Sequence, residues 1–152
     1  MNYKHTQIGY LTIFVTAAVF GLFSWTQMMA RAEPPSINSG SNLLVTAFMV
    51  FVLLLLVSFW TLNVEITQEK ILIKFGYGFV RKSFNLSDVV SAKSVKNKWY
   101  FGWGVRRWFW PKMWIYNVSG FDAVEIVLKN GNIYRIGTDE PEKLERAILS
   151  KN

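Results

Sequence analysis

Residues 43–62, LLVTAFMVFVLLLLVSFWTL, form a run of 20 residues that contains no charged side chain. A helix of about 20 apolar residues is long enough to cross the hydrocarbon core of a lipid bilayer. An earlier run at residues 8–29 is also uncharged, and the Pro, Gly, Ser and Asn residues of 30–42 favour a break between helices. The two runs therefore predict a membrane α-helical hairpin, with spans at about 8–29 and 43–62 and a short loop at 30–42.

Two other interpretations of these runs remain open. A buried helical pair would need far more covering chain than the residues after position 62 can supply. A cleaved signal peptide is suggested by Ala30, Arg31 and Ala32, which have the small-x-small pattern that signal peptidase prefers. The first run is, however, longer than the apolar region of about 7 to 15 residues usual in signal peptides, so two spans are the preferred prediction.

The distribution of basic residues predicts the orientation of the spans. The formal net charge is +7, and 15 of the 17 Lys and Arg residues follow the second run. Because cytoplasmic segments of membrane proteins carry an excess of Lys and Arg, the C-terminal part is expected in the cytoplasm. Two spans then place the N-terminus on the same side.

Residues 63–152 have a different pattern and predict a β domain. Short runs rich in β-branched and aromatic residues are separated by turn residues, as is typical of strands. Seven antiparallel strands are predicted, at residues 63–67, 70–75, 79–84, 89–95, 113–118, 123–129 and 132–137. Hairpin turns are expected at residues 68–69, 119–120 and 130–131.

A helix is predicted after the last strand. Asp139 and Glu142 have the spacing of a capping box, and Pro141 lies in the first turn, where no backbone N–H is needed. Leu144 and Ile148 then fall on one helical face. We expect this helix to cap the open end of a small, strongly bent sheet or barrel.

Four sequence blocks resemble the signature of bacterial PH-like (pleckstrin-homology-like) domain-containing membrane proteins. The blocks are FGWGVR at 101–106, YNVSG at 116–120, AVE at 123–125 and RIGTDEP at 135–141. The resemblance implies a PH-like seven-stranded bent sheet or barrel capped by a C-terminal helix, in a multi-pass protein of the bacterial cytoplasmic (inner) membrane. It implies little about chemistry, because a fold does not fix a function. The dense basic motif of eukaryotic phosphoinositide-binding domains is not matched at residues 67–74, which hold only two lysines.

Residues 98–116, KWYFGWGVRRWFWPKMWIY, combine nine aromatic residues with four cationic side chains. Trp and Tyr favour the membrane interface, and Arg and Lys can reach lipid phosphates from the same depth. We therefore predict a surface that binds the membrane or a partner, formed by Lys98, Trp99, Trp103, Arg106, Arg107, Trp108, Trp110 and Lys112.

Two alternatives apply to the same stretch. A domain of this size has little core, and large rings could fill it. Trp, Tyr and Arg are also the residue types enriched in protein–protein hot spots, which favours a docking surface for another membrane protein. Nucleic acid is not expected as a partner, because the stretch is predicted to face the membrane.

Charge is concentrated in one half of the predicted domain. Residues 70–112 contain ten Lys and Arg residues and one acidic residue, whereas residues 113–152 contain five basic and six acidic residues. No linker separates the second apolar run from the first predicted strand, so the domain is expected to lie against the bilayer. The basic half is then the side expected to face anionic headgroups.

Catalysis is not predicted. The chain has no cysteine, and its one histidine, His5, falls in the N-terminal tail, so histidine triads, thiol nucleophiles and Cys or His metal sites are not expected. No cofactor is expected either. The sequence favours a non-catalytic, membrane-anchored binding or scaffold module whose partners are the anionic lipid headgroups of the bilayer and another membrane protein. The alternative function is an accessory subunit of a larger membrane protein complex.

Overall fold

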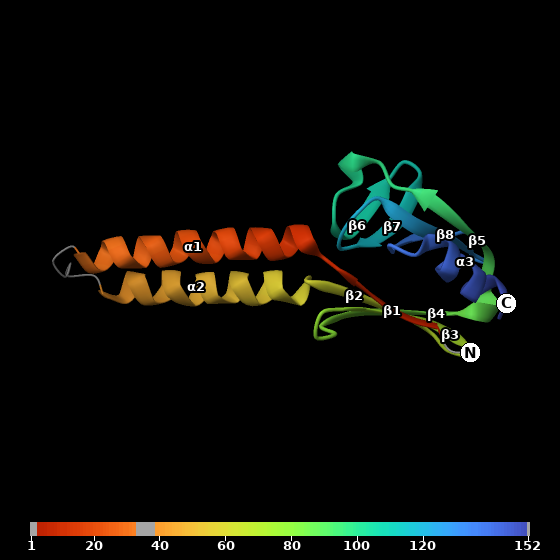
Figure 1. The fold of residues 1–152 in the computed structure, drawn as a ribbon, viewed down its shortest axis with the longest axis horizontal. Coiled ribbons are helices and arrows are strands. Elements are labelled where there is room, and N and C mark those ends of the chain that lie inside the picture. The colour runs from red at the N-terminus through yellow and green to blue at the C-terminus, as the bar shows by residue number, and fades with distance from the viewer. Residues whose placement is uncertain (1–2, 33–38, 152) are drawn as a thin grey trace.

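The computed structural model describes residues 3–32 and 39–151 and shows a pair of helices attached to one end of a β domain (Figure 1). Residues 33–38, in the predicted loop, lie outside the described chain. The helices are α1 (Tyr10–Ala32), α2 (Ser39–Ser58) and α3 (Pro141–Leu149), with two short 3-10 helices, η1 (Leu86–Asp88) and η2 (Trp99–Phe101). The strands are β1 (Tyr3–Ile8), β2 (Thr61–Ile66), β3 (Lys70–Phe75), β4 (Val80–Asn85), β5 (Val89–Lys96), β6 (Gly104–Phe109), β7 (Lys112–Asn117), β8 (Asp122–Leu128) and β9 (Ile133–Gly137).

The nine strands of the described chain form two sheets. The first has the order β1-β2-β3-β4, and the second has the order β5-β8-β9-β7-β6. All neighbours are antiparallel except β7 and β9, which are parallel. All seven predicted strands are present, but β1 and β6 are additional, so the expectation of seven antiparallel strands is wrong. The turn expected at 119–120 is not a hairpin either, because β9 lies between β7 and β8.

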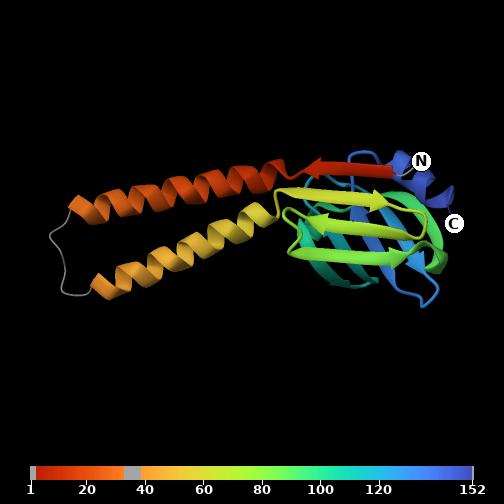
Figure 2. The ribbon, with the colours of Figure 1, turned by 90° about the horizontal axis from the view of Figure 1, so that it is seen from below.

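Strand β1 precedes α1 and pairs with β2, so that Tyr3 lies opposite Ile66 and Ile8 lies opposite Thr61. The helical pair is therefore inserted between two neighbouring strands of one sheet (Figure 2). The β domain contains residues 3–8 as well as 61–149, which differs from the expected boundary at residue 63. Cleavage of a signal peptide after Ala32 would remove β1 from this sheet, which argues against that interpretation.

The apolar runs and the helices do not have the same limits. Within the described residues, one helix is long and apolar enough to cross a membrane, over Tyr10–Ala30, whereas Leu43–Ser58 is apolar but shorter. The expected second span, 43–62, extends past the end of α2, because Leu62 is buried in the β domain. The uncharged run continues from α2 into β2 without interruption, because a buried strand is as apolar as a helix in lipid.

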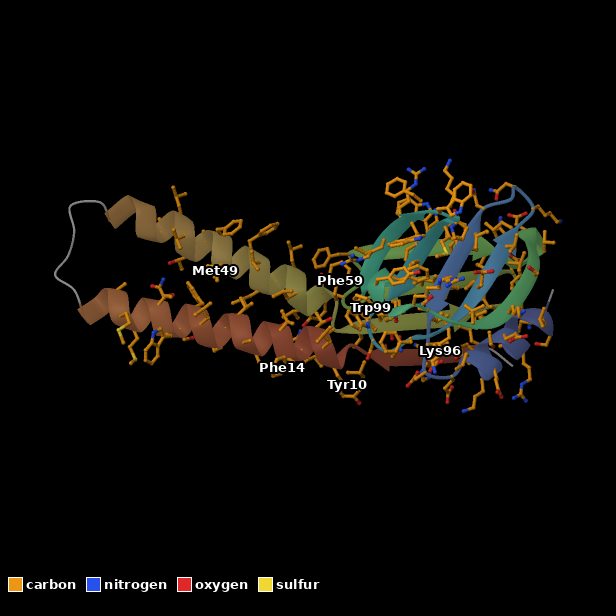
Figure 3. The ribbon with its side chains drawn as sticks, turned by 90° about the horizontal axis from the view of Figure 1, so that it is seen from above. Tyr10, Phe14, Met49, Phe59, Lys96 and Trp99 are labelled. Atoms are coloured by element: carbon orange, nitrogen blue, oxygen red, sulfur yellow. The ribbon has the colours of Figure 1, made fainter. Side chains whose placement is uncertain are left out.

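Helices α1 and α2 extend away from the β domain, and many of their large apolar side chains, including Phe14, are exposed (Figure 3). The two helices are joined where they meet the domain. The indole Nε1 of Trp60 donates a hydrogen bond of 3.0 Å to Oγ1 of Thr16 in α1. The backbone N–H of Gly9 donates a hydrogen bond of 2.6 Å to the carbonyl of Trp60. The rest of the chain therefore does not cover the apolar surface of these two helices.

The core lies between the two sheets and includes Leu144 and Ile148 of α3, which packs against β5 and β8. The predicted helix and its buried face are thus confirmed. The predicted capping box is wrong, because the N-cap residue is Glu140 and its side chain makes no capping hydrogen bond. Asp139 lies one residue before the N-cap, and its carboxylate contacts the ring of His5 on β1.

Glu145 fixes α3 to β5 through its side chain. The Ser94 hydroxyl and the Ser94 backbone N–H, the latter at 2.8 Å, both donate to Oε2 of Glu145. These hydrogen bonds lower the pKa of the Glu145 carboxyl. Because they favour the carboxylate, their contribution to stability is present above the unfolded-state pKa of about 4.3 and is lost as pH falls through the lower folded-state pKa.

We expect Glu145→Gln to lower the melting temperature of the full-length protein at pH 7, and this difference from wild type to shrink as the pH falls below about 4. Thermal unfolding of both proteins in detergent at several pH values measures this. Glu142→Gln is the matched control, because Glu142 is exposed on the same helix, and its effect should be small throughout. A difference between wild type and Glu145→Gln that is independent of pH would contradict the prediction.

Candidate membrane-proximal site

Residues 98–116 fold into η2 and the antiparallel hairpin of β6 and β7, in which Arg107 lies opposite Trp114. Strand β6 is not among the predicted strands, although four of its neighbouring and constituent residues, Arg106, Arg107, Trp108 and Trp110, belong to the predicted surface. It lies at the edge of the second sheet and is the strand of that sheet nearest to α1 and α2 (Figure 1). The aromatic and basic stretch is therefore at the end of the domain from which the helices leave.

A groove of about 390 Å³ lies between the base of the helices and β6. Its lining comes from α1, from the end of α2 and from the start of β6, and includes Thr12, Leu56, Phe59, Trp103, Val105 and Arg106. Most of these side chains are apolar, and Arg106 is the charged member. The groove is thus an apolar surface that is continuous with the helices and has one guanidinium group beside it.

The predicted residues differ in exposure. Trp99 and Trp110 are 77% and 90% exposed, whereas Trp103 and Trp108 are half-buried. Lys98, Arg106, Arg107 and Lys112 are exposed. The core interpretation applies to Phe101, which is buried with Met113 and Ile115 in a small cluster of its own.

The predicted residues do not form one patch, because successive residues of β6 point to opposite faces of the sheet. Trp108 lies on the same face as η2, with its ring centroid 4.8 Å from that of Phe101 and 5.6 Å from that of Tyr100. Arg107 lies on the other face, with its guanidinium 5.9 Å from the ring centroid of Trp114. Arg106 and Trp108 therefore belong to the η2 side of the strand, and Arg107 does not.

The cations of this stretch are not neutralised by the rest of the described chain. The salt bridges among the described residues involve Arg135, Lys143, Arg146 and His5. The Nε group of Arg106 donates to the Trp103 carbonyl at 3.1 Å, and Lys98 Nζ lies 5.6 Å from the ring centroid of Tyr100. Neither contact removes the positive charge, so the site attracts anions.

The β3–β4 turn contains two exposed aromatic residues outside the predicted surface, Tyr77 and Phe79. Its N-terminal residue, Gly76, donates a backbone hydrogen bond of 2.8 Å to Thr61, the first residue of β2. The turn therefore lies at the same end of the domain as α2. The aromatic rings beside Gly76 and Gly78 were the available signal in the sequence, but two rings in a short turn do not stand out by composition.

His5 does not lie in a free tail, because its strand pairs with β2 and its ring contacts the carboxylates of Asp139 and Glu140. Across residues 3–32 and 39–151, no group of three His, Asp or Glu side chains is arranged to hold a metal ion. No protein-family model and no curated protein matches this chain.

Proposed function

We propose that this protein is a non-catalytic, membrane-anchored binding module, in which α1 and α2 both cross the cytoplasmic membrane and the β domain, PH-like in fold, lies against anionic lipid headgroups. The groove between the helices and β6 is the observation that supports this most directly. Its apolar lining can accommodate the acyl chain of a lipid. Arg106, beside the groove, can donate a hydrogen bond to the phosphate of the same lipid.

The pairing of β1 with β2 supports an even number of crossings. Strand β1 precedes α1 and strand β2 follows α2, and these two strands are paired. A chain that leaves the β domain through α1 must therefore return to the same side through α2. The 23 residues of α1 give a length of about 35 Å at about 1.5 Å per residue, which is sufficient for a hydrocarbon core of about 30 Å. The excess of basic residues after α2 supports a cytoplasmic location for both termini.

An accessory subunit of a larger membrane complex is the second candidate. It is favoured by the position of β6 at the sheet edge, where a partner strand could add to its backbone. The exposed rings of Trp99 and Trp110 would then be contacts with that partner instead of with lipid.

Nitroxide labels at single introduced cysteines test the orientation, since the natural chain has none. We expect a label at Trp99→Cys, in the full-length protein in nanodiscs, to be protected from a water-soluble nickel relaxation reagent. Trp99 is 77% exposed and lies toward the end of the domain from which the helices extend (Figure 3). Ser150→Cys is the control, because the C-terminus lies at the opposite end of the domain (Figure 1).

Equal access of the reagent to positions 99 and 150 in nanodiscs would contradict the proposed contact with lipid. If position 99 were protected in native membranes but accessible in nanodiscs of the purified protein, the accessory-subunit function would be favoured instead.

A further inference from the structure

The β3–β4 turn, residues 76–79, is held directly against the end of α2. A Cβ atom placed on Gly76 would lie only 2.4 Å from the backbone carbonyl oxygen of Ser58, which is the last residue of that helix. Figure 2 shows this turn at the end of the first sheet from which the helices extend. Its distance from the membrane boundary is therefore fixed by backbone packing.

Two aromatic rings of this turn are left uncovered by the chain. Tyr77 is 79% exposed and Phe79 is 83% exposed, on either side of Gly78. Tyr is enriched at the membrane–water interface, and Phe is a common apolar side chain of interfacial segments. The turn thus has the composition of an interfacial contact, separate from the β6 site on the other sheet.

Two cations lie on the strands that flank this turn. Lys74 on β3 and Arg81 on β4 are register partners. Their side chains are on the outer face of the sheet, because Ile73 and Phe75, which flank Lys74, point into the core. Like charges that are directly opposite each other on neighbouring strands repel, so this pair costs stability unless an anion lies between its members.

The acidic residue of the first sheet that shares this face is Glu65 on β2, which lies opposite Leu72 and not opposite Lys74. The segment 70–82 contains four cations and no acidic residue, and neither Lys74 nor Arg81 takes part in a salt bridge among the described residues. The Nε group of Arg81 donates to the Gly78 carbonyl at 3.2 Å, which holds the guanidinium beside the turn without neutralising it.

A shallow hollow of about 420 Å³ lies over this pair, lined by Leu72, Ile73, Lys74, Arg81, Lys82 and Ser83. It offers ammonium, guanidinium and hydroxyl donors to one anion. We propose that Lys74 and Arg81 bind the phosphate of an anionic phospholipid, with Tyr77 and Phe79 inserted between neighbouring lipids. This inference rests on the proposed function, since the lipid comes from the bilayer that α1 and α2 cross.

The test uses the full-length protein in neutral detergent, titrated with short-chain phosphatidylglycerol, short-chain phosphatidylcholine and inorganic phosphate, with bound lipid counted by native mass spectrometry. Wild type is expected to bind phosphatidylglycerol in preference to phosphatidylcholine. Lys74→Gln/Arg81→Gln is expected to lose phosphatidylglycerol affinity by about fivefold per cation, or about 25-fold in total. The matched control, Lys96→Gln/Lys129→Gln, removes two exposed lysines elsewhere on the domain and should keep wild-type affinity.

Thermal unfolding checks that the double variant is folded. Without anionic lipid it should melt at or above the wild-type temperature, because the repulsion is relieved, and with phosphatidylglycerol it should melt below wild type. Unchanged phosphatidylglycerol affinity in the variant would overturn the inference, and so would inorganic phosphate that binds as tightly as the lipid. If the Trp99 label is protected while the variant keeps its lipid affinity, this inference fails and the proposed function stands. A Trp99 label as accessible as Ser150 would refute the proposed function itself.

Discussion

Replacing Leu144 with Asp is expected to unfold the β domain of the full-length protein. Leu144 is 0% exposed and lies with Ile148 in the core between the two sheets. Truncation of a buried leucine alone costs about 2–5 kcal/mol, and an unpaired carboxylate in the same place adds the cost of removing a charge from water. Together these costs approach the whole stability of a typical domain, about 5–15 kcal/mol.

Leu149→Asp provides the control for this variant, because Leu149 is 49% exposed on the same helix. A surface change of this kind should alter the free energy of unfolding by no more than about 0.5 kcal/mol. Near-ultraviolet circular dichroism in detergent would show the loss of β-domain packing, while far-ultraviolet spectra would still report α1 and α2. If the two variants unfolded at the same temperature, α3 would not be part of the core.

Gly76→Ala is expected to destabilise the junction between α2 and the first sheet by about 3 kcal/mol or more. Gly76 has a φ of 44°, and a Cβ atom there would lie 2.4 Å from the Ser58 carbonyl oxygen. The substitution therefore adds left-handed backbone strain and a backbone clash. Relief would require the β3–β4 turn to move away from the helix.

Gly78→Ala separates these two effects. Gly78 has a φ of 89°, but a Cβ atom at this position meets nothing within 4 Å. It should cost only the backbone strain, about 1–2 kcal/mol, so the melting temperatures of the two variants should differ by roughly 10 °C. Equal destabilisation of both variants in thermal unfolding would mean that the contact with Ser58 contributes nothing.

The fold could be predicted from the sequence where apolar residues alternate along a strand. Strand β3 has this pattern, and its inward residues Ile71, Ile73 and Phe75 are buried. Strand β1 was missed because His5 and Gln7 occupy its inward positions, so no apolar alternation marks it. The parallel pairing of β7 with β9 was also missed, because the partner of a strand is set by the whole sheet and not by the local sequence.

For the candidate site, the sequence predicts which residue types are present but not how they are arranged. Trp103 and Arg106 line the groove at the base of the helices, but the sequence did not show that β6 divides the rings and cations of residues 98–112 between two faces. Trp108 is half-buried against Phe101, whereas Trp110 is almost fully exposed, and only packing distinguishes these two. Tyr77 and Phe79 lie near the end of α2 because Gly76 packs against Ser58. No local sequence pattern predicts this contact between two distant segments.

The pairing of β1 with β2 also has a consequence for biosynthesis. The ribosome releases β1 first, but its partner follows only after both helices have been made, and closing such a long loop in free solution carries an entropic cost. In the proposed two-span topology, insertion of the two helices side by side would bring the ends of β1 and β2 together and reduce that cost. Completion of the first sheet would thus depend on correct membrane insertion. A chain that fails to insert would have an unpaired edge at β2, which the quality-control proteases of the cell could recognise.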